Sequence, residues 1–181
     1  MGAFSGLMIA SNASPIGQSM FGLSAAAAAV YVSVYSLSNT MGRVIWGAVS
    51  DKLGQPTTIS IMYSVIILTF LILIFVKSMF GFTIGIVGLG LCFGGVMGVF
   101  PSSVMDNFGP KFQGVNYGIV FIGYSTAAFV APKVTAGIAA ANNGDFTKAF
   151  YVAIVVAVAG LILDLVYKKK TATKAITETA Q

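Results

Sequence analysis

Long apolar segments separated by short polar turns make up nearly the whole chain. A helix needs about 20 apolar residues to cross the hydrocarbon core of a bilayer. Five segments have that length: 22–49, 57–76, 80–104, 115–140 and 148–167. Residues 1–11 are also apolar, but as a helix they would extend only about 16 Å. The pattern predicts an all-α, polytopic membrane helix bundle over residues 1–167, with five full spans and a truncated first helix.

Composition supports a membrane protein and excludes several other classes. Hydrophobic residues make up 57% of the chain and charged residues 8%, and the mean hydropathy is +0.91, which lies outside the range of soluble globular domains. The net charge of +5 does not indicate nucleic-acid binding, because four of the ten basic residues lie in the tail, at Lys168, Lys169, Lys170 and Lys174. The chain has no histidine and one cysteine, Cys92. We therefore expect no metal site, no cofactor and no intramolecular disulfide.

Orientation follows from the basic residues between the spans, because these are retained on the cytoplasmic side. With the tail 168–181 in the cytoplasm, the loops that hold Lys52 and Lys111 are cytoplasmic too, and Lys77 and Lys148 lie outside. The protein is expected in the plasma membrane. Asp164 and Lys168 stand four residues apart, a spacing that favours an interfacial ion pair.

A polar stripe runs along the segment 22–49. Tyr31, Tyr35, Asn39, Arg43 and Gly47 recur every four residues, so they share one face of a helix. Arg43 lies about 12 Å inside the end of the segment, where a charge is costly unless it faces a cavity. We expect Arg43 to receive a carboxylate, which its planar fork of donors suits. Tyr31 and Tyr35 would line the pocket and donate hydroxyls, and Asn39 would orient the anion. The alternative is that Arg43 reaches the cytoplasmic headgroups.

Two further residues bear on the substrate. Tyr124 falls near the middle of the segment 115–140, whereas Lys133 falls near its outer end and on the opposite face of the helix. Lys133 is therefore expected to extend toward the outer headgroups. With one cation at the expected depth, the chain favours a small monocarboxylate, or an anion completed by a group outside the chain.

Glycines and prolines mark two other features. Residues 81–98 hold seven glycines, several at four-residue spacing. This pattern is typical of close helix packing in lipid, although a sliding surface is the alternative. Phe100 and Pro101, just after this segment, are expected to kink or end its helix.

The turn after the polar stripe carries a family resemblance. Gly47, Asp51, Lys52 and Gly54 form the pattern GxxxDKxG between two apolar segments, which resembles the signature loop of the major facilitator superfamily. The longer pattern NxxGRxxWGxxSDKxG, together with GLMIASNASPIGQ near the start and NYG at 116–118, is similar to the oxalate/formate antiporter family. Two positions depart from it: Gln55 and Pro56 stand where a basic residue is usual, and Tyr124 stands where oxalate-type members carry lysine.

The resemblance implies a fold and a mechanism. It places the chain as the carboxy-terminal half of a two-bundle transporter, so that the chain begins inside the seventh helix. It implies an anion contact by Arg43 and a gating loop at Gly47, Asp51, Lys52 and Gly54, in which Asp51 binds a neighbouring helix and Asp106 and Lys111 are candidate partners. The partners would be a small organic anion, the lipid bilayer, and a missing amino-terminal six-helix half or a second copy. A five-span protein with a re-entrant first segment is the alternative for the chain's beginning.

The functional prediction is therefore secondary transport of a small organic anion, such as formate, oxalate or another monocarboxylate, by alternating access. No Asp or Glu lies in the middle of a span, which favours exchange or uniport over proton symport. The protein is not expected to be an enzyme. The alternative function is that of a non-transporting membrane packing or assembly subunit.

Overall fold

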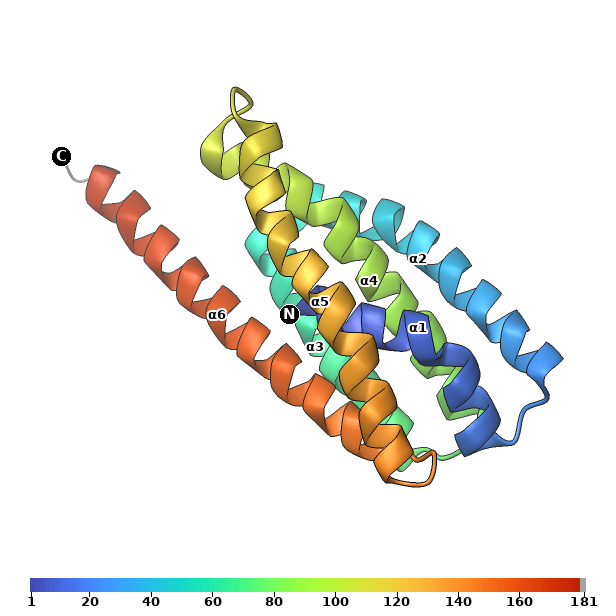
Figure 1. Cartoon of the computed structure of the whole chain (residues 1–181). Helices are drawn as coiled ribbons and strands as arrows, with labels where there is room; N and C mark the ends of the chain where they lie inside the picture. The colour runs from blue at the N-terminus through green and yellow to red at the C-terminus, as the bar shows by residue number, and fades with distance from the viewer. Residues whose placement is uncertain (180–181) are drawn as a thin grey trace.

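Six helices make up the computed structural model, which describes residues 1–179, with side chains described through Lys170. The described residues form no strand. The helices, in chain order, are α1 (Gly2–Phe21), α2 (Ala25–Leu53), α3 (Gln55–Phe75), α4 (Met79–Phe108), α5 (Gln113–Ala141) and α6 (Thr147–Thr179) (Figure 1). The predicted all-α membrane bundle is confirmed. The five longer segments overlap α2 to α6 in order, although α6 continues well beyond the predicted end at residue 167.

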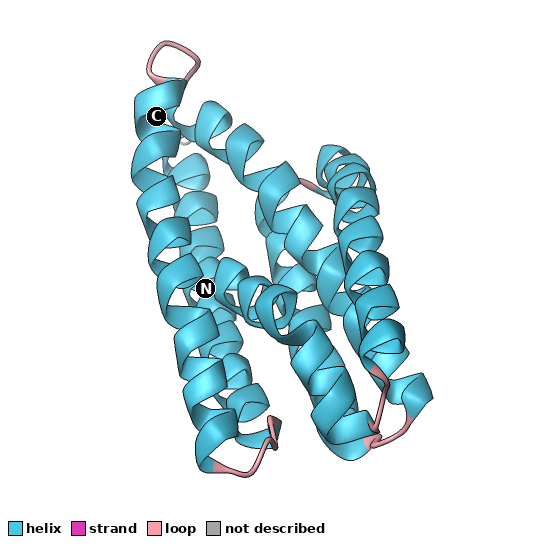
Figure 2. Ribbon diagram, turned by 45° about the vertical axis from the view of Figure 1, so that its right-hand side comes forward, coloured by secondary structure: helices cyan, strands magenta, loops and turns pink. Residues whose placement is uncertain are grey.

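The connections between helices are short, and polar residues set several of the helix ends. The hydroxyl of Ser24 accepts from the backbone N–H of Ala27 at the start of α2, and the hydroxyl of Ser78 does the same for Gly81 in α4, both at 3.2 Å. Gly54 alone separates α2 from α3 and has a φ of 77°, a conformation that glycine adopts without steric cost. The second glycine of the GxxxDKxG pattern therefore makes a one-residue turn possible. Figure 2 shows how little of the chain lies in such loops.

The first helix is longer than the sequence predicts. α1 continues through Ser11, Asn12 and Pro15 to Phe21, whereas the apolar pattern ends near residue 11. The helix continues because its polar side chains bind its own carbonyl groups: Ser11 donates to the oxygen of Leu7, and Asn12 to that of Met8 at 2.9 Å. In Figures 1 and 2 the amino terminus lies in the middle of the bundle, away from its two ends.

Pro101 was predicted to kink or end its helix, and it does not end it. Pro101 lies inside α4, which continues to Phe108 and ends at Gly109, whose φ is 75°. Pro101 has no N–H, so the carbonyl oxygen four residues earlier loses its usual helical donor, and the helix continues past it. The hydroxyl of Ser102 donates to the carbonyl oxygen of Val99 at 2.9 Å.

Among the described residues, four helices are long and apolar enough to cross a membrane: α3, α4, α5 and the part of α6 from Thr147 to Lys170. α2 has the same length as α5, 29 residues, but Asn39, Arg43 and several serines make it more polar. The helix that holds the predicted polar stripe thus differs in composition from its neighbours.

α4 is the centre of the bundle, and glycines let two neighbours approach it closely. Gly90, Gly94 and Gly98 face α2. A methyl group added at Gly94 would lie 1.9 Å from the backbone oxygen of Asn39, and one at Gly42 of α2 would lie 2.1 Å from the backbone oxygen of Leu91. Because backbone atoms cannot give way as a side chain can, α2 and α4 are in direct backbone contact. The prediction of close packing by the glycine-rich segment is confirmed.

A second edge of the same helix faces α3. Methyl groups added at Gly85 and Gly88 would meet the side chains of Leu73 and Thr69, at 2.3 and 3.0 Å. The buried core continues from here into α1 and α6, through residues such as Ile9, Ile16, Phe70, Phe82 and Phe150.

α2 and α5 expose large apolar side chains to the outside of the bundle. Val44 of α2 is 73% exposed and Ile119 of α5 is 62% exposed, whereas the buried positions of α5 are the small residues Ala127, Ala131, Thr135 and Ala139. An apolar outer surface is the normal state of a helix in lipid or against another membrane helix.

Polar contacts fix α6 at its start and again around Asp164. Near the start, the carboxylate of Asp145 accepts from the hydroxyl and the backbone N–H of Thr147, at 2.6 and 2.8 Å. These bonds, the hydroxyl bond first, hold the pKa of Asp145 below its usual value. Further along the helix, where an Asp164–Lys168 ion pair was expected, both side chains bind groups of α3: Asp164 accepts from Ser60, and Lys168 donates to the hydroxyl of Thr57 at 3.0 Å.

The backbone contact between α2 and α4 generates a stability prediction. Gly94→Ala should lower the free energy of unfolding by about 1–3 kcal/mol, the usual cost of overpacking, because its methyl group overlaps a backbone oxygen. Gly137→Ala is the matched control, since a methyl group there has no neighbouring atom within 4 Å. Thermal unfolding in detergent, followed by circular dichroism, measures both. Equal stability of the two variants would contradict the close contact.

Candidate substrate site

Arg43 projects from a part of α2 that is fixed to α4. Its backbone oxygen lies 2.9 Å from the position of a methyl group on Gly98, while its side chain is exposed. One guanidinium nitrogen donates to the side-chain oxygen of Asn39 at 3.4 Å, a long and therefore weak bond. The other guanidinium donors can thus receive an anion.

The side chain of Asn39 is only half satisfied. Its oxygen accepts from Arg43, but its amide nitrogen is buried and has no hydrogen-bond partner among the described residues. A buried polar group without a partner costs about 1–3 kcal/mol. Two donors, one of them charged, therefore stand side by side on α2.

Tyr31 and Tyr35 make contacts between helices. The hydroxyl of Tyr31 lies 3.0 Å from that of Thr83 on α4, and Tyr35 donates to the carbonyl oxygen of Gly6 on α1 at 2.7 Å. Tyr35 is also fully buried, at 4% exposure. The structure thus uses both hydroxyls to join α2 to its neighbours, and neither tyrosine lines the cavity described next.

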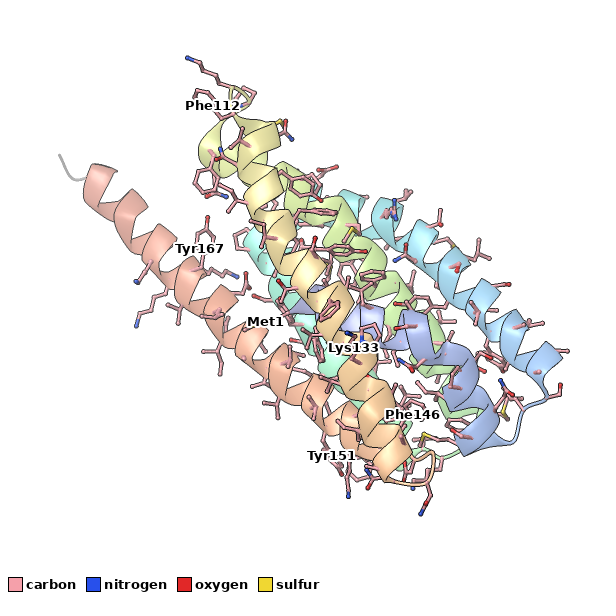
Figure 3. All side chains as sticks on the ribbon, viewed as in Figure 1. Met1, Phe112, Lys133, Phe146, Tyr151 and Tyr167 are labelled. Atoms are coloured by element: carbon pink, nitrogen blue, oxygen red, sulfur yellow. The ribbon has the colours of Figure 1, made fainter. Side chains whose placement is uncertain are left out.

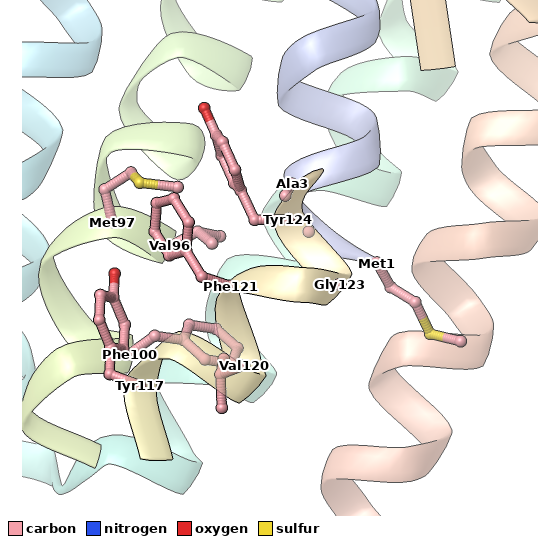
Figure 4. Close-up of a pocket in the computed structure, with 11 residues that line it drawn as sticks. Met1, Ala3, Val96, Met97, Phe100, Tyr117, Val120, Phe121, Gly123 and Tyr124 are labelled. Carbon is pink, nitrogen blue, oxygen red and sulfur yellow. The ribbon is translucent and has the colours of Figure 1, made fainter. Parts of the chain in front are cut away.

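A cavity of about 120 Å³ lies between the start of α1, the second half of α4 and the first half of α5 (Figure 4). Tyr117 and Tyr124 of α5 line it, together with the largely apolar set Met1, Gly2, Ala3, Val96, Met97, Phe100, Val120, Phe121 and Gly123. Figure 4 shows both tyrosine rings on the α4 side of α5. Tyr124 was predicted as a site residue from its depth, and it does line a cavity.

Tyr117 was not predicted as a site residue. It stands seven residues before Tyr124, a spacing of about two turns that places both on one face of a helix. That spacing was the available signal, but without a known neighbour for α5 the sequence does not indicate which face is lined by other helices.

Aromatic rings connect this cavity to α2. Phe93 of α4 lies between Tyr35 and Tyr124, with ring centroids 6.4 Å apart on each side, and its ring is nearly parallel to that of Tyr124, at 6°. Phe121 continues the series, 4.7 Å from Tyr124 and 5.3 Å from Tyr117. We call these five residues the aromatic series. It joins α2, α4 and α5.

The polar stripe and the cavity adjoin the same stretch of α4. The backbone of Arg43 packs against Gly98 of α4, and the neighbours Met97 and Phe100 line the cavity. The cation of α2 thus stands beside the part of α4 that forms one wall of the cavity.

The predicted gating loop lies at the far end of α2. Asp51, Lys52 and Gly54 are exposed, and Gly47 is half-buried. Asp106 was a candidate partner for Asp51, but the structure pairs Asp106 with the side-chain amide of Gln55, the first residue of α3. The gating role of the loop remains a prediction.

Lys133 does not line the cavity. Its ammonium lies 3.6 Å from the ring centroid of Phe129, one turn earlier on α5, and both side chains are exposed (Figure 3). This cation–π contact stabilises a lysine on the outer face of a helix. In the described part of the chain no group of three or more acidic, histidine or cysteine residues could hold a metal ion.

Comparison with known proteins places this geometry in a family. The model of the Major Facilitator Superfamily matches residues 1–181. The oxalate:formate antiporter of Oxalobacter formigenes is 31% identical over 152 residues, which cover 82% of this chain and 35% of that protein. The uncharacterized MFS-type transporter YhjX of Escherichia coli (strain K12) is 33% identical over 121 residues, which cover 66% of this chain and 30% of that protein.

A third relative, the apicoplast pyruvate carrier 1 of Toxoplasma gondii, is 36% identical over 89 residues, or 48% of this chain and 16% of that protein. The chain thus spans about a third of the length of the first two relatives. The resemblance to oxalate/formate antiporters is confirmed, and the family indicates an integral membrane protein from a family of transporters. The chain belongs to the Major Facilitator Superfamily.

Proposed function

We propose that this chain forms the anion-binding part of a secondary transporter for small monocarboxylates. The observation that carries the proposal is the pair formed by Arg43 and Asn39. A carboxylate held by the guanidinium would lie beside the amide nitrogen of Asn39, which has no partner in the described part of the chain. One ligand would then satisfy a charge and a buried donor together.

The number of charges favours one carboxylate over two. Arg43 supplies a positive charge, and Tyr124 stands where oxalate-type relatives carry a lysine. No lysine or arginine lines the described cavity. A second carboxylate would lose its hydration beside aromatic rings without a cation to compensate it. Two relatives fit an organic anion substrate by name, as an oxalate:formate antiporter and a pyruvate carrier.

Alternating access would require a second bundle. The exposed apolar faces of α2 and α5 flank the proposed site, and the relatives are about three times as long as the region they share with this chain. We propose that an amino-terminal six-helix half, or a second copy, covers this side, that the site lies between the two bundles, and that the loop of Gly47, Asp51, Lys52 and Gly54 is a gate between conformations.

The proposed setting is the plasma membrane, with the carboxyl terminus in the cytoplasm. Lys168, Lys169 and Lys170 then lie on the side where basic residues are retained. Exchange or uniport is proposed over proton symport, because the middle of the spans carries no Asp or Glu.

Arg43→Gln should weaken carboxylate binding while the fold is retained. Removal of a charged hydrogen-bond donor should weaken binding at least about tenfold. Trp46, the only tryptophan in the chain, stands three residues from Arg43, so its fluorescence can follow titration of the chain in lipid nanodiscs with sodium acetate, with sodium chloride as the salt control. Lys133→Gln removes a cation away from the cavity and should bind acetate as the parent does.

Circular dichroism of the same samples reports the fold. If Arg43→Gln lowers the unfolding temperature and leaves acetate affinity unchanged, Arg43 is a packing residue. That result would favour a non-transporting assembly subunit.

Tyr124→Lys should change substrate preference from monocarboxylates toward dicarboxylates, because it adds a second cation beside the cavity. The ratio of oxalate affinity to acetate affinity should rise about tenfold or more in the same fluorescence titration. Tyr151→Lys adds the same charge on the exposed side of α6 and should leave the ratio unchanged. A similar increase in both variants would show an effect of net charge alone.

The chain by itself should not transport. In proteoliposomes that contain only the purified monomeric chain, uptake of radiolabelled acetate should equal that of empty vesicles, because one wall of the pathway is missing. The dimeric fraction from size exclusion is measured separately. Saturable uptake by the monomer would show that no second bundle is needed.

A further inference from the structure

Tyr117 differs from most buried or half-buried tyrosines in the bundle. The hydroxyls of Tyr31, Tyr35 and Tyr63 have partners, Tyr63 accepting from the backbone N–H of Gly2 at 3.2 Å. Tyr117 and Tyr124 make ring contacts, but within the described residues neither hydroxyl has a hydrogen-bond partner. These are the two tyrosines that line the cavity.

The ring of Tyr117 is held in place while its hydroxyl stays available. Phe121, one turn later on α5, packs against it at 5.3 Å and 57°, and Phe100 of α4 lines the same space (Figure 4). A ring fixed by neighbours loses little entropy when it binds a ligand. The backbone of Arg43 packs against Gly98 of α4, beside Met97 and Phe100, which line the same cavity as Tyr117, so an anion near Arg43 would lie toward Tyr117.

The space beside Tyr117 suits a small apolar group. Val96, Met97 and Val120 contribute to its wall, and its volume is about 120 Å³. One water takes about 30 Å³ in the liquid, and an apolar cavity of about 150 Å³ holds benzene. The cavity can therefore hold about four water-sized groups, which matches the body of a short-chain acid and exceeds a bare formate.

We propose that Tyr117 is a substrate-binding residue that donates its hydroxyl to the carboxylate received by Arg43, and that the adjoining cavity holds the apolar body of a short-chain monocarboxylate. The proposal rests on the function proposed above, since it requires that Arg43 receives a carboxylate. It adds a specificity residue on α5 and narrows the substrate class to acids with a short carbon chain beyond the carboxylate.

The first test compares Tyr117→Phe with Tyr151→Phe, a matched control that removes a hydroxyl from an exposed tyrosine on α6. Both are titrated with acetate and propionate in nanodiscs by Trp46 fluorescence. Tyr117→Phe should weaken both acids about tenfold, the effect of one hydrogen bond to a charged group, and Tyr151→Phe should match the parent. Because the ring is kept, the aromatic packing and the fold should be unchanged in circular dichroism.

The second test fills the cavity without removing a polar group. Gly123 lines the cavity, and a side chain added there has no atom within 4 Å at its first carbon. Gly123→Val should weaken propionate several-fold more than formate. Gly137→Val is the control, because Gly137 lies on the same helix, also has open space and does not line the cavity.

The outcomes separate this inference from the proposed function. If no carboxylate changes the Trp46 fluorescence of the parent chain more than sodium chloride does, the proposed function and the role of Tyr117 are both overturned. If Arg43→Gln loses binding but Tyr117→Phe equals Tyr151→Phe, the function stands and the role of Tyr117 is overturned. If Gly123→Val affects formate and propionate equally, the cavity does not hold the carbon chain.

Discussion

The backbone contact between α2 and α4 is the constraint on which the rest of the site depends. Helices in a bilayer gain little from burying apolar surface against one another, so close packing must hold them together. At Gly94 the two backbones are so close that no side chain fits between them, and the contact falls on Asn39 and Arg43 themselves. The backbone positions of Asn39 and Arg43, the donors of the proposed site, are therefore fixed by this close contact with α4.

The other wall of the site is fixed in a different way. α5 buries mainly small residues such as Ala131 and Thr135. Small side chains interdigitate little with those of a neighbouring helix such as α1. Its position relative to α2 depends more on the aromatic series, in which Phe93 lies between Tyr35 and Tyr124. Phe93 is held in turn by Gly6, where a methyl group would lie 2.2 Å from its ring. One phenylalanine thus connects the rigid half of the site to the more loosely packed half.

The sequence predicted the helices better than the site. Apolar length and residue spacing describe a single helix, whereas the site depends on which helices are neighbours. Apolar length gave the helices from α2 onward because lipid imposes it. The end of α1 was missed because Ser11 and Asn12 resemble a polar turn, yet their side chains bind carbonyls of the same helix. Four-residue spacing placed Tyr31 and Tyr35 on one face with Arg43. It does not identify the neighbouring helices, and groups of α4 and α1 bind the two hydroxyls. Tyr117 was missed for the same reason.

The charge balance connects the fold to substrate choice. A cation such as Arg43 is costly in a bilayer, and its side chain is exposed on α2. In the proposed function one bound carboxylate would neutralise it, so the loaded site would carry no net charge through the membrane. A dicarboxylate would leave one negative charge among the rings of Phe121 and Tyr124, where desolvation is not repaid by a partner. Under the proposed function, a tyrosine at position 124 in place of the lysine of oxalate-type members would therefore change the net charge of the loaded site, and with it the class of anion that could be carried at low cost.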